Sequence, residues 1–190
     1  MAVPKPAWGE VYEVAAATTA QDLLRLPDDG SKYELYEGTL VREMTSPGYG
    51  DIYHRLNGLL FVYAQTIGFT NRIVQHALFD LTLPGAARRT VLAPDIAILR
   101  TSTRPSWDVP REIPLLAVEV VSESQTLVGF ALKAQYYRNA GVDEVWIVDH
   151  SSRTVEVWTA QGRTTLTDAQ TLTTPLLPGF QAQVSYLLDG

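Results

Sequence analysis

Two short apolar runs in the middle of the chain have the length and composition of buried β-strands. The first spans residues 93–99 and the second spans residues 115–121. Both are rich in branched apolar residues, and proline, serine or arginine lies at their ends. Each run also contains one carboxylate, Asp95 in the first and Glu119 in the second. Because a carboxylate in a buried strand must be paired, protonated or bound to a cation, these two residues are the first candidates for a functional site.

A helical period appears in two longer segments. Between residues 50 and 67, apolar side chains recur at steps of three and four, which predicts an amphipathic helix that Gly68 ends. A second helix is predicted from Ser124, its N-cap, to about Ala140. Lys133 lies at the border of the apolar stripe of this second helix, from where its long side chain can reach over the edge of a sheet.

The other elements are predicted from shorter patterns. In chain order they are a short capped helix (18–26), a β-hairpin with its turn near Gly38 (32–44), one bent strand or two short ones (72–83), and a further hairpin (144–158). The helix between two apolar strands favours a right-handed crossover between parallel strands, and the earlier strands are expected to pair as antiparallel hairpins. The pattern predicts an α/β fold, a mixed β-sheet flanked by helices with additional β-hairpins. Residues 1–17 are interpreted as an N-terminal arm and residues 18–190 as a single domain.

Composition narrows the possible functions. Hydrophobic residues make up 46% of the 190 residues and charged residues 19%, as in an ordinary globular protein. The absence of cysteine excludes disulfides, zinc–thiolate sites and cysteine nucleophiles. No apolar run approaches the roughly 20 residues of a membrane span and no signal-peptide core is present, so we expect a cytoplasmic protein without a membrane partner. The net charge of −6 argues against indiscriminate nucleic-acid binding, so a nucleic-acid function needs a local basic patch or a partner.

The strand carboxylates and the helix lysine together suggest a metal site. Magnesium prefers oxygen ligands, usually one or two carboxylates, and keeps several waters. Asp95 and Glu119 on successive strands could meet at one ion, with the backbone carbonyl of Val120 as a third ligand. A lysine two residues after the glutamate would point to the same face, but Val121 stands there, so Lys133 is its replacement and could position water or offset phosphate charge. The alternative is a buried Glu119–Lys133 ion pair that only shapes the core.

These positions also carry a resemblance to a known family. It rests on segments in this order: Tyr33-Glu34-Leu35-x-x-Gly38, Pro94-Asp95, Val118-Glu119-Val120-Val121-Ser122-x-Ser124, Lys133 to Tyr137, and Ala140-Gly141-Val142-x-Glu144-x-Trp146-Ile147-Val148-Asp149. Over about residues 18–188 the chain resembles the bacterial family of putative restriction endonuclease-like proteins in the PD-(D/E)XK nuclease superfamily. The resemblance implies a restriction-endonuclease-like core and magnesium-dependent cleavage of DNA, with Mn²⁺ as a possible substitute. It also implies that Asp95 and Glu119 bind the metal, that Lys133 is a migrated lysine, and that Glu34 matches an acidic position of the site.

The resulting hypothesis is a homodimeric, magnesium-dependent endonuclease acting on DNA. An alternative is a catalytically silent nuclease-fold protein that serves as an interaction or assembly module, and a third possibility is a metal-dependent hydrolase of another phosphate ester. The acidic net charge favours the silent alternative, as do departures from the family pattern at three positions: Tyr49, Glu123 and Gly129. Glu34 has its own alternative, an ion pair with Lys32 or Arg42 across the hairpin.

A few further polar or aromatic residues lie in predicted helices, strands or loops near these positions in the chain. We predict that His54 lies on a solvated helix face and that His76 is a satisfied core histidine rather than a ligand. The Arg88–Arg89 pair is expected in a solvated loop rather than in a phosphate grip. Trp107 lies in a proline-rich loop, where it either contacts a partner or packs on its own domain.

Overall fold

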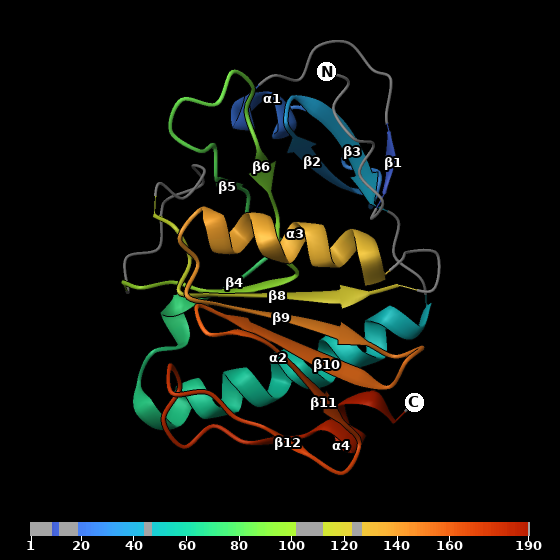
Figure 1. Cartoon of the computed structure of the whole chain (residues 1–190), viewed down its shortest axis with the longest axis vertical. Helices are drawn as coiled ribbons and strands as arrows, with labels where there is room; N and C mark the ends of the chain where they lie inside the picture. Colours follow the sequence, from blue (N-terminus) through green and yellow to red (C-terminus); the bar gives the residue numbers. More distant parts are fainter. Residues whose placement is uncertain (1–8, 12–18, 44–46, 102–111, 123–126, 190) are drawn as a thin grey trace.

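A six-stranded mixed β-sheet forms the centre of the protein (Figure 1). The structure is a computed structural model that describes residues 9–11, 19–43, 47–101, 112–122 and 127–189. The strands, in their order across the sheet, are β11 (Gly162–Thr167), β10 (Thr154–Thr159), β9 (Glu144–Asp149), β8 (Leu116–Val121), β7 (Ile96–Ile98) and β4 (Ile73–Gln75). Only β8 and β9 pair in parallel, and the other four pairs among these described strands are antiparallel.

Two helices cover the two faces of this sheet. Helix α3 (Leu127–Asn139) connects β8 with β9 and packs on both strands, and α2 (Pro47–Ile67) lies on the opposite face (Figure 1). Alternate residues of β8 face the two helices, so Val118 and Val120 join the core under α2, whereas Ala117 and Val121 join the core under α3. This double burial explains why β8 and β9 are apolar runs rather than alternating patterns. The predicted mixed sheet flanked by helices is confirmed.

A second, five-stranded antiparallel sheet contains the predicted hairpin. Its strands, in order, are β1 (Glu10–Val11), β3 (Thr39–Glu43), β2 (Lys32–Tyr36), β6 (Val91–Leu92) and β5 (Phe79–Asp80). Glu37 and Gly38 both have positive φ angles, 46° and 76°, which suits a two-residue hairpin turn at the predicted place. Residues 72–83 form two short strands, as one of the alternatives predicted, and these belong to different sheets. Residues 10–11 of the predicted arm pair with β3.

Short elements complete the chain. Thr19 and Asp22 form a reciprocal capping box on helix α1 (Ala20–Leu23), which is shorter than the predicted helix. The remaining elements are the 3₁₀ turn η1 (Thr70–Arg72), β12 (Thr171–Leu172), β13 (Ala182–Gln183) and α4 (Val184–Leu188). Phe180 stacks on Trp146, so the C-terminal segment packs on the core under α2. Among the described helices, none combines the length and the apolar character that crossing a membrane requires.

Candidate metal centre

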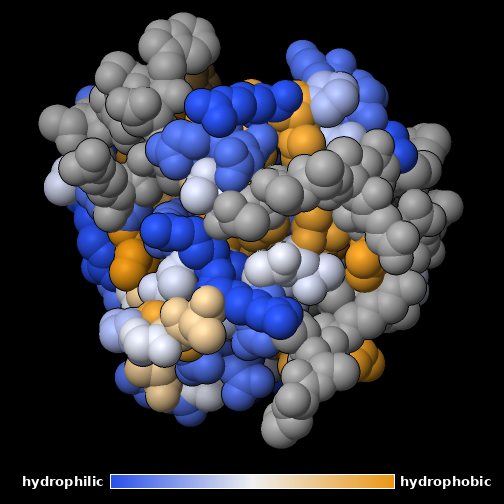
Figure 2. Space-filling model, turned by 90° about the horizontal axis from the view of Figure 1, so that it is seen from above, coloured by the Kyte–Doolittle hydropathy of each residue, from blue (hydrophilic) through white to orange (hydrophobic). Residues whose placement is uncertain are grey.

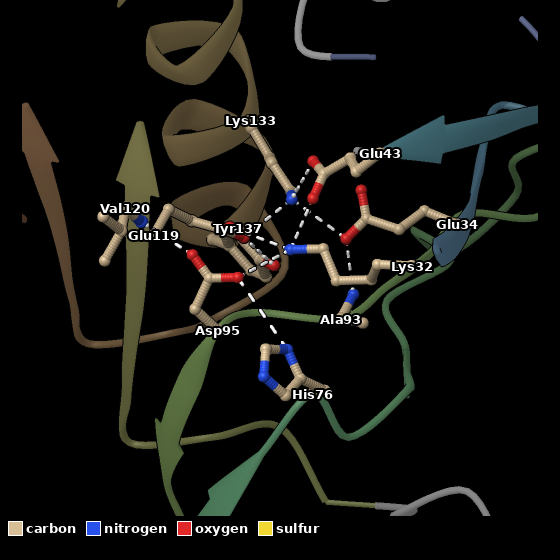
Figure 3. A network of polar contacts seen from close by, with 10 residues as sticks. All are labelled: Lys32, Glu34, Glu43, His76, Ala93, Asp95, Glu119, Val120, Lys133 and Tyr137. Carbon is tan, nitrogen blue, oxygen red and sulfur yellow. Dashed lines mark hydrogen bonds and ion pairs between the residues drawn. The ribbon is translucent and has the colours of Figure 1, made fainter. Parts of the chain in front are cut away.

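The four side chains singled out in the sequence lie in one cluster between the two sheets and α3 (Figure 3). Lys133 Nζ on α3 lies 2.8 Å from Glu119 Oε1 on β8 and 2.9 Å from Glu34 Oε1 on β2. Asp95, in the turn before β7, joins them through Lys32, whose Nζ lies 2.9 Å from Asp95 Oδ1 and 3.5 Å from Glu119 Oε2. The Glu119–Lys133 ion pair is therefore present, and it is part of a larger network.

Three members of the cluster were not assigned to the site from the sequence: Lys32, Glu43 and Tyr137. Glu43 Oε2 lies 2.5 Å from Lys32 Nζ, and Glu43 Oε1 lies 3.0 Å from Lys133 Nζ. The Tyr137 hydroxyl donates a hydrogen bond to Glu119 Oε1 at 2.7 Å. The register of the hairpin could have indicated that Lys32 and Glu43 form a pair, because they are directly opposite each other on β2 and β3. Tyr137 is one helical turn after Lys133, so its side chain lies on the same face of α3.

Backbone groups fix two of the carboxylates. The Val120 amide donates to Asp95 Oδ2 at 2.7 Å, and the Ala93 amide donates to Glu34 Oε1 at 2.7 Å. Ala93 and Asp95 belong to the short connection between β6 and β7, which passes from the second sheet to the central one. The cluster is thus held at the junction of the two sheets. A ligand role for the Val120 carbonyl stays a prediction; the group of Val120 that contacts Asp95 is its amide, which belongs to the preceding peptide unit.

Three carboxylates have the spacing of a metal site. One oxygen each from Glu43, Asp95 and Glu119 lies within 4.8 Å of the others. Glu119 Oε2 is buried and lacks a hydrogen-bond partner among the described residues, although Lys32 Nζ is within ion-pair distance. An all-oxygen set of this kind suits Mg²⁺ or Mn²⁺. The residues present therefore fit a divalent ion, with Glu43 as an additional candidate ligand that was not predicted.

The charges of the cluster are unequal when every group is ionised. Among the described residues, the carboxylates of Glu34, Glu43, Asp95 and Glu119 pair with the ammonium groups of Lys32 and Lys133, and His76 lies at the edge, 3.9 Å from Asp95. With a neutral His76, four carboxylates and two ammonium groups leave an excess of two negative charges. All six side chains are buried or nearly so. Because uncompensated charge in a protein interior is costly, this excess favours either protonated carboxyl groups or a bound divalent cation.

The pKa values of the carboxyl groups are shifted in different directions. Burial raises the pKa of Glu119 to about 8, although Lys133 and Lys32 act against this shift. Burial likewise raises the pKa of Glu34. For Asp95 burial is outweighed by the charges of Lys32 and Lys133, which hold its pKa below the ordinary value. Burial is also outweighed at both lysines, whose pKa values the surrounding carboxylates raise. Near neutral pH, Asp95 is therefore ionised while Glu119 carries a proton.

A cavity of about 730 Å³ adjoins the cluster on the side of Lys32. Helix α1, the loop after it and the first turns of α2 contribute to its walls, and Lys32, Tyr49, His76 and Ala93 line the part next to the cluster. The Tyr49 hydroxyl is buried, and burial together with the nearby charge of Asp95 raises its pKa. The end of the molecule that carries β2, β3 and α1 has a mixed hydrophilic and hydrophobic surface (Figure 2). Among the charged side chains of the cluster, Lys32 is the one that lines this cavity.

The prediction that His76 is a core histidine is wrong. Its side chain is 44% exposed, and its Nδ1 lies 3.9 Å from Asp95 Oδ1 at the cavity wall. His76 has a φ angle of 49° directly after β4, and this left-handed turn swings the side chain out of the strand pattern. His54 is exposed as predicted.

The remaining predictions fall on both described and undescribed residues. Arg88 and Arg89 are exposed in their loop, and Arg89 pairs with Asp80 at 2.5 Å. The ion pair of Glu34 is with Lys133, while Arg42 pairs with Asp29 at 3.0 Å. Trp107, Glu123 and Ser124 lie outside the described residues.

Comparisons with known proteins bear on the fold and the family. The family model Uma2, described as putative restriction endonuclease, matches residues 20–185. The crystal structure of a putative nuclease belonging to DUF820 from Anabaena variabilis ATCC 29413 is similar with a TM-score of 0.70 and 15% sequence identity, over 88% of this chain and 96% of that chain. None of the curated proteins matches. The predicted nuclease-like fold and the family resemblance are confirmed. Since the family model covers most of the chain, this protein belongs to the Uma2 family of putative restriction endonucleases.

Proposed function

We propose that this protein is a magnesium-dependent endonuclease that hydrolyses DNA phosphodiester bonds, with Mn²⁺ as a possible substitute. The family and the fold support a nuclease. The observation that carries the metal dependence is the convergence of Glu43, Asp95 and Glu119, with carboxylate oxygens within 4.8 Å of one another. The excess negative charge of the cluster supports a divalent ion in the same place.

Each residue of the cluster has a proposed role. Asp95 and Glu119 hold the ion, Glu43 and the Val120 carbonyl complete its protein ligands, and waters fill the remaining positions. The bound ion would supply Lewis-acid stabilisation of the phosphate and an acidified water. Lys133 assists the attacking water and, through its contacts of 2.8–3.0 Å with Glu119, Glu34 and Glu43, orients the carboxylates.

Glu34 has a supporting role in this proposal. Its Oε1 accepts a hydrogen bond from the Ala93 amide and lies 2.9 Å from Lys133 Nζ. It therefore fixes the position of the ammonium that Glu119 also contacts. We further propose that the protein acts as a homodimer in the cytoplasm, and sedimentation velocity tests the oligomeric state.

The experiment is DNA cleavage with a matched pair of aspartate variants. Supercoiled, linear and single-stranded DNA are incubated with Mg²⁺, Mn²⁺ or EDTA. We expect cleavage in either metal, loss of cleavage in Asp95→Asn, and full activity in Asp143→Asn. Asp143 serves as the control because it is an exposed aspartate paired with Arg100, outside the cluster. If a folded wild-type protein cleaves none of these DNA forms, the proposal is refuted, and a panel of other phosphate esters then tests hydrolysis of a different substrate.

One observation favours a second candidate, a catalytically silent nuclease-fold protein that serves as an interaction or assembly module. The Lys32 ammonium already contacts the three carboxylates that would bind the ion. If it stays there permanently, no ion binds. Calorimetric titration with Mn²⁺ separates the candidates, because a silent protein gives no binding heat and Glu119→Gln then changes nothing.

A further inference from the structure

Lys32 contacts the same three carboxylates that have the spacing of a metal site. Its Nζ lies 2.5 Å from Glu43 Oε2, 2.9 Å from Asp95 Oδ1 and 3.5 Å from Glu119 Oε2 (Figure 3). We propose that Lys32 is a tethered cation that competes with the divalent ion, so that metal binding requires its ammonium to move out of the cluster. This inference rests on the proposed function and adds a residue that controls metal affinity.

The two lysines of the cluster differ in which carboxylates they contact. Lys133 lies against Glu34, Glu43 and Glu119, whereas Lys32 lies against Glu43, Asp95 and Glu119. Lys32 is therefore the cation whose ion pairs coincide with the candidate ligand set.

A divalent ion and this ammonium exclude each other from the ligand set. Magnesium binds oxygens at about 2.1 Å, so it would sit among the three carboxylates, where the Lys32 ammonium already makes its contacts. If both cations contacted the same carboxylate oxygens, the ammonium and the divalent ion would repel each other strongly in this poorly solvated interior. Since the same oxygens serve both, binding of the ion must break the contacts of Lys32.

Lys32 has a path along which its ammonium can leave. Its side chain retains 11% exposure and lines the 730 Å³ cavity beside Tyr49 and His76. Lys133 is fully buried and is not among the described residues that line this cavity. The flexible four-carbon stem of a lysine permits this motion without a change in the β2–β3 pairing that holds the Lys32 backbone. The displaced ammonium would then face the cavity, where it can attract the phosphate of a substrate.

Mn²⁺ affinity of charge-matched variants tests the inference. Calorimetry and the electron paramagnetic resonance signal of free Mn²⁺ are measured for the full chain, for Lys32→Met and for Lys32→Arg. Arg42→Met is the control, since it removes one positive charge from the adjacent strand, where Arg42 pairs with Asp29. We expect Lys32→Met to bind Mn²⁺ at least about tenfold more tightly than the wild type, and Arg42→Met to bind as the wild type does. Lys32→Arg is expected to bind no more tightly than the wild type.

A measurement on the wild type does not depend on the folding of Lys32→Met. In protein labelled with ¹³C at the lysine ε-carbon, the Lys32 resonance, assigned with Lys32→Arg, should shift on addition of Mg²⁺ in step with binding. Equal Mn²⁺ affinity of wild type and Lys32→Met, weaker binding by Lys32→Met, or an unmoved Lys32 resonance at saturating Mg²⁺ would each overturn the competition while leaving the metal site intact. If neither protein binds Mn²⁺ at all, the proposed metal-dependent function fails and the inference fails with it.

Discussion

Metal binding at this cluster should release a proton from Glu119. Burial raises the pKa of Glu119 to about 8, whereas Asp95 keeps a pKa below its ordinary value and is already ionised. A metal ligand must be deprotonated, so an ion that binds at neutral pH has to displace the proton of Glu119. Titration of the protein with Mn²⁺ at several pH values therefore tests this proton release.

The magnitude follows from the pKa of Glu119. With a pKa of about 8, roughly nine-tenths of the Glu119 side chains carry a proton at pH 7, so each bound ion should release about 0.9 proton. The apparent affinity should rise about fiftyfold between pH 6 and pH 8 and only about twofold above pH 8, where little proton remains to be displaced. Because Asp95 is ionised throughout this range, it adds nothing to the slope.

Calorimetry in buffers with different ionisation enthalpies measures the number of protons directly. At pH 7, the observed heat of Mn²⁺ binding should vary linearly with the buffer enthalpy, and the slope gives the protons released. Glu119→Gln should remove the slope and weaken binding, while the control Asp143→Asn should keep both. A wild-type slope near zero, together with an affinity that is constant from pH 6 to pH 8, would show that Glu119 is ionised in the free protein and would refute the reasoning.

Three further predictions concern stability. The pKa of Glu119 is raised from an ordinary 4.5 to about 8, so its contribution to the stability of the metal-free protein is fully present below about pH 4.5 and is lost as the pH rises through about 8. Urea unfolding in EDTA should show this decline in the free energy of unfolding. A free energy of unfolding that rises over this pH range would contradict the prediction. Lys133→Met removes the buried ammonium that Glu34, Glu43 and Glu119 share and should lower the free energy of unfolding by about 3–5 kcal/mol at pH 7, against less than about 1 kcal/mol if the cluster is well solvated. Thr19→Ala removes the capping box and should cost about 1 kcal/mol in the same assay, whereas no loss would show that the cap of α1 is dispensable.

The sequence identified those members of the cluster that lie in strongly patterned elements. Asp95 and Glu119 stood out because they interrupt apolar runs, and Lys133 because it borders an apolar helical stripe. Val118 and Ala117 show why the central sheet was predictable, since both faces of β8 are buried and the whole run is apolar. These features depend on local composition, which a single sequence displays.

Lys32 and Glu43 could not be assigned in the same way. They lie on the β2–β3 hairpin, whose alternating pattern is typical of a sheet with one solvated face. In the structure Leu35, on one face of the hairpin, packs in a small apolar core with α1. Glu34 and Glu43, on the other face, lie against Lys133 of α3, so both faces of the hairpin are covered. Only the docking of the second sheet against α3 buries these charges, and no local pattern records that docking. The position of His76 was predicted wrongly for a different reason, because the sequence gives no sign of a positive φ angle at this histidine.

The balance of charge bears on the choice between a metal site and a purely structural ion-pair network. A network that only shaped the core would be most stable with equal numbers of buried acids and bases, and apolar residues of similar volume often serve the core as well or better. Here the two ammonium groups face four carboxylates, and the pKa of Glu119 is raised although two lysines lie within 3.5 Å of its oxygens. With Lys32 in place the surplus is two negative charges. With a divalent ion in place of its ammonium, the four carboxylates would face Lys133 and the ion, which leaves a surplus of one, and Glu119 Oε2, which lacks a hydrogen-bond partner among the described residues, would be available to the ion. Protonation of Glu119 also removes one of these charges, so the two cases differ in their response to an added ion: a structural network keeps Lys32 and the Glu119 proton in place when Mn²⁺ is added, whereas a metal site releases both.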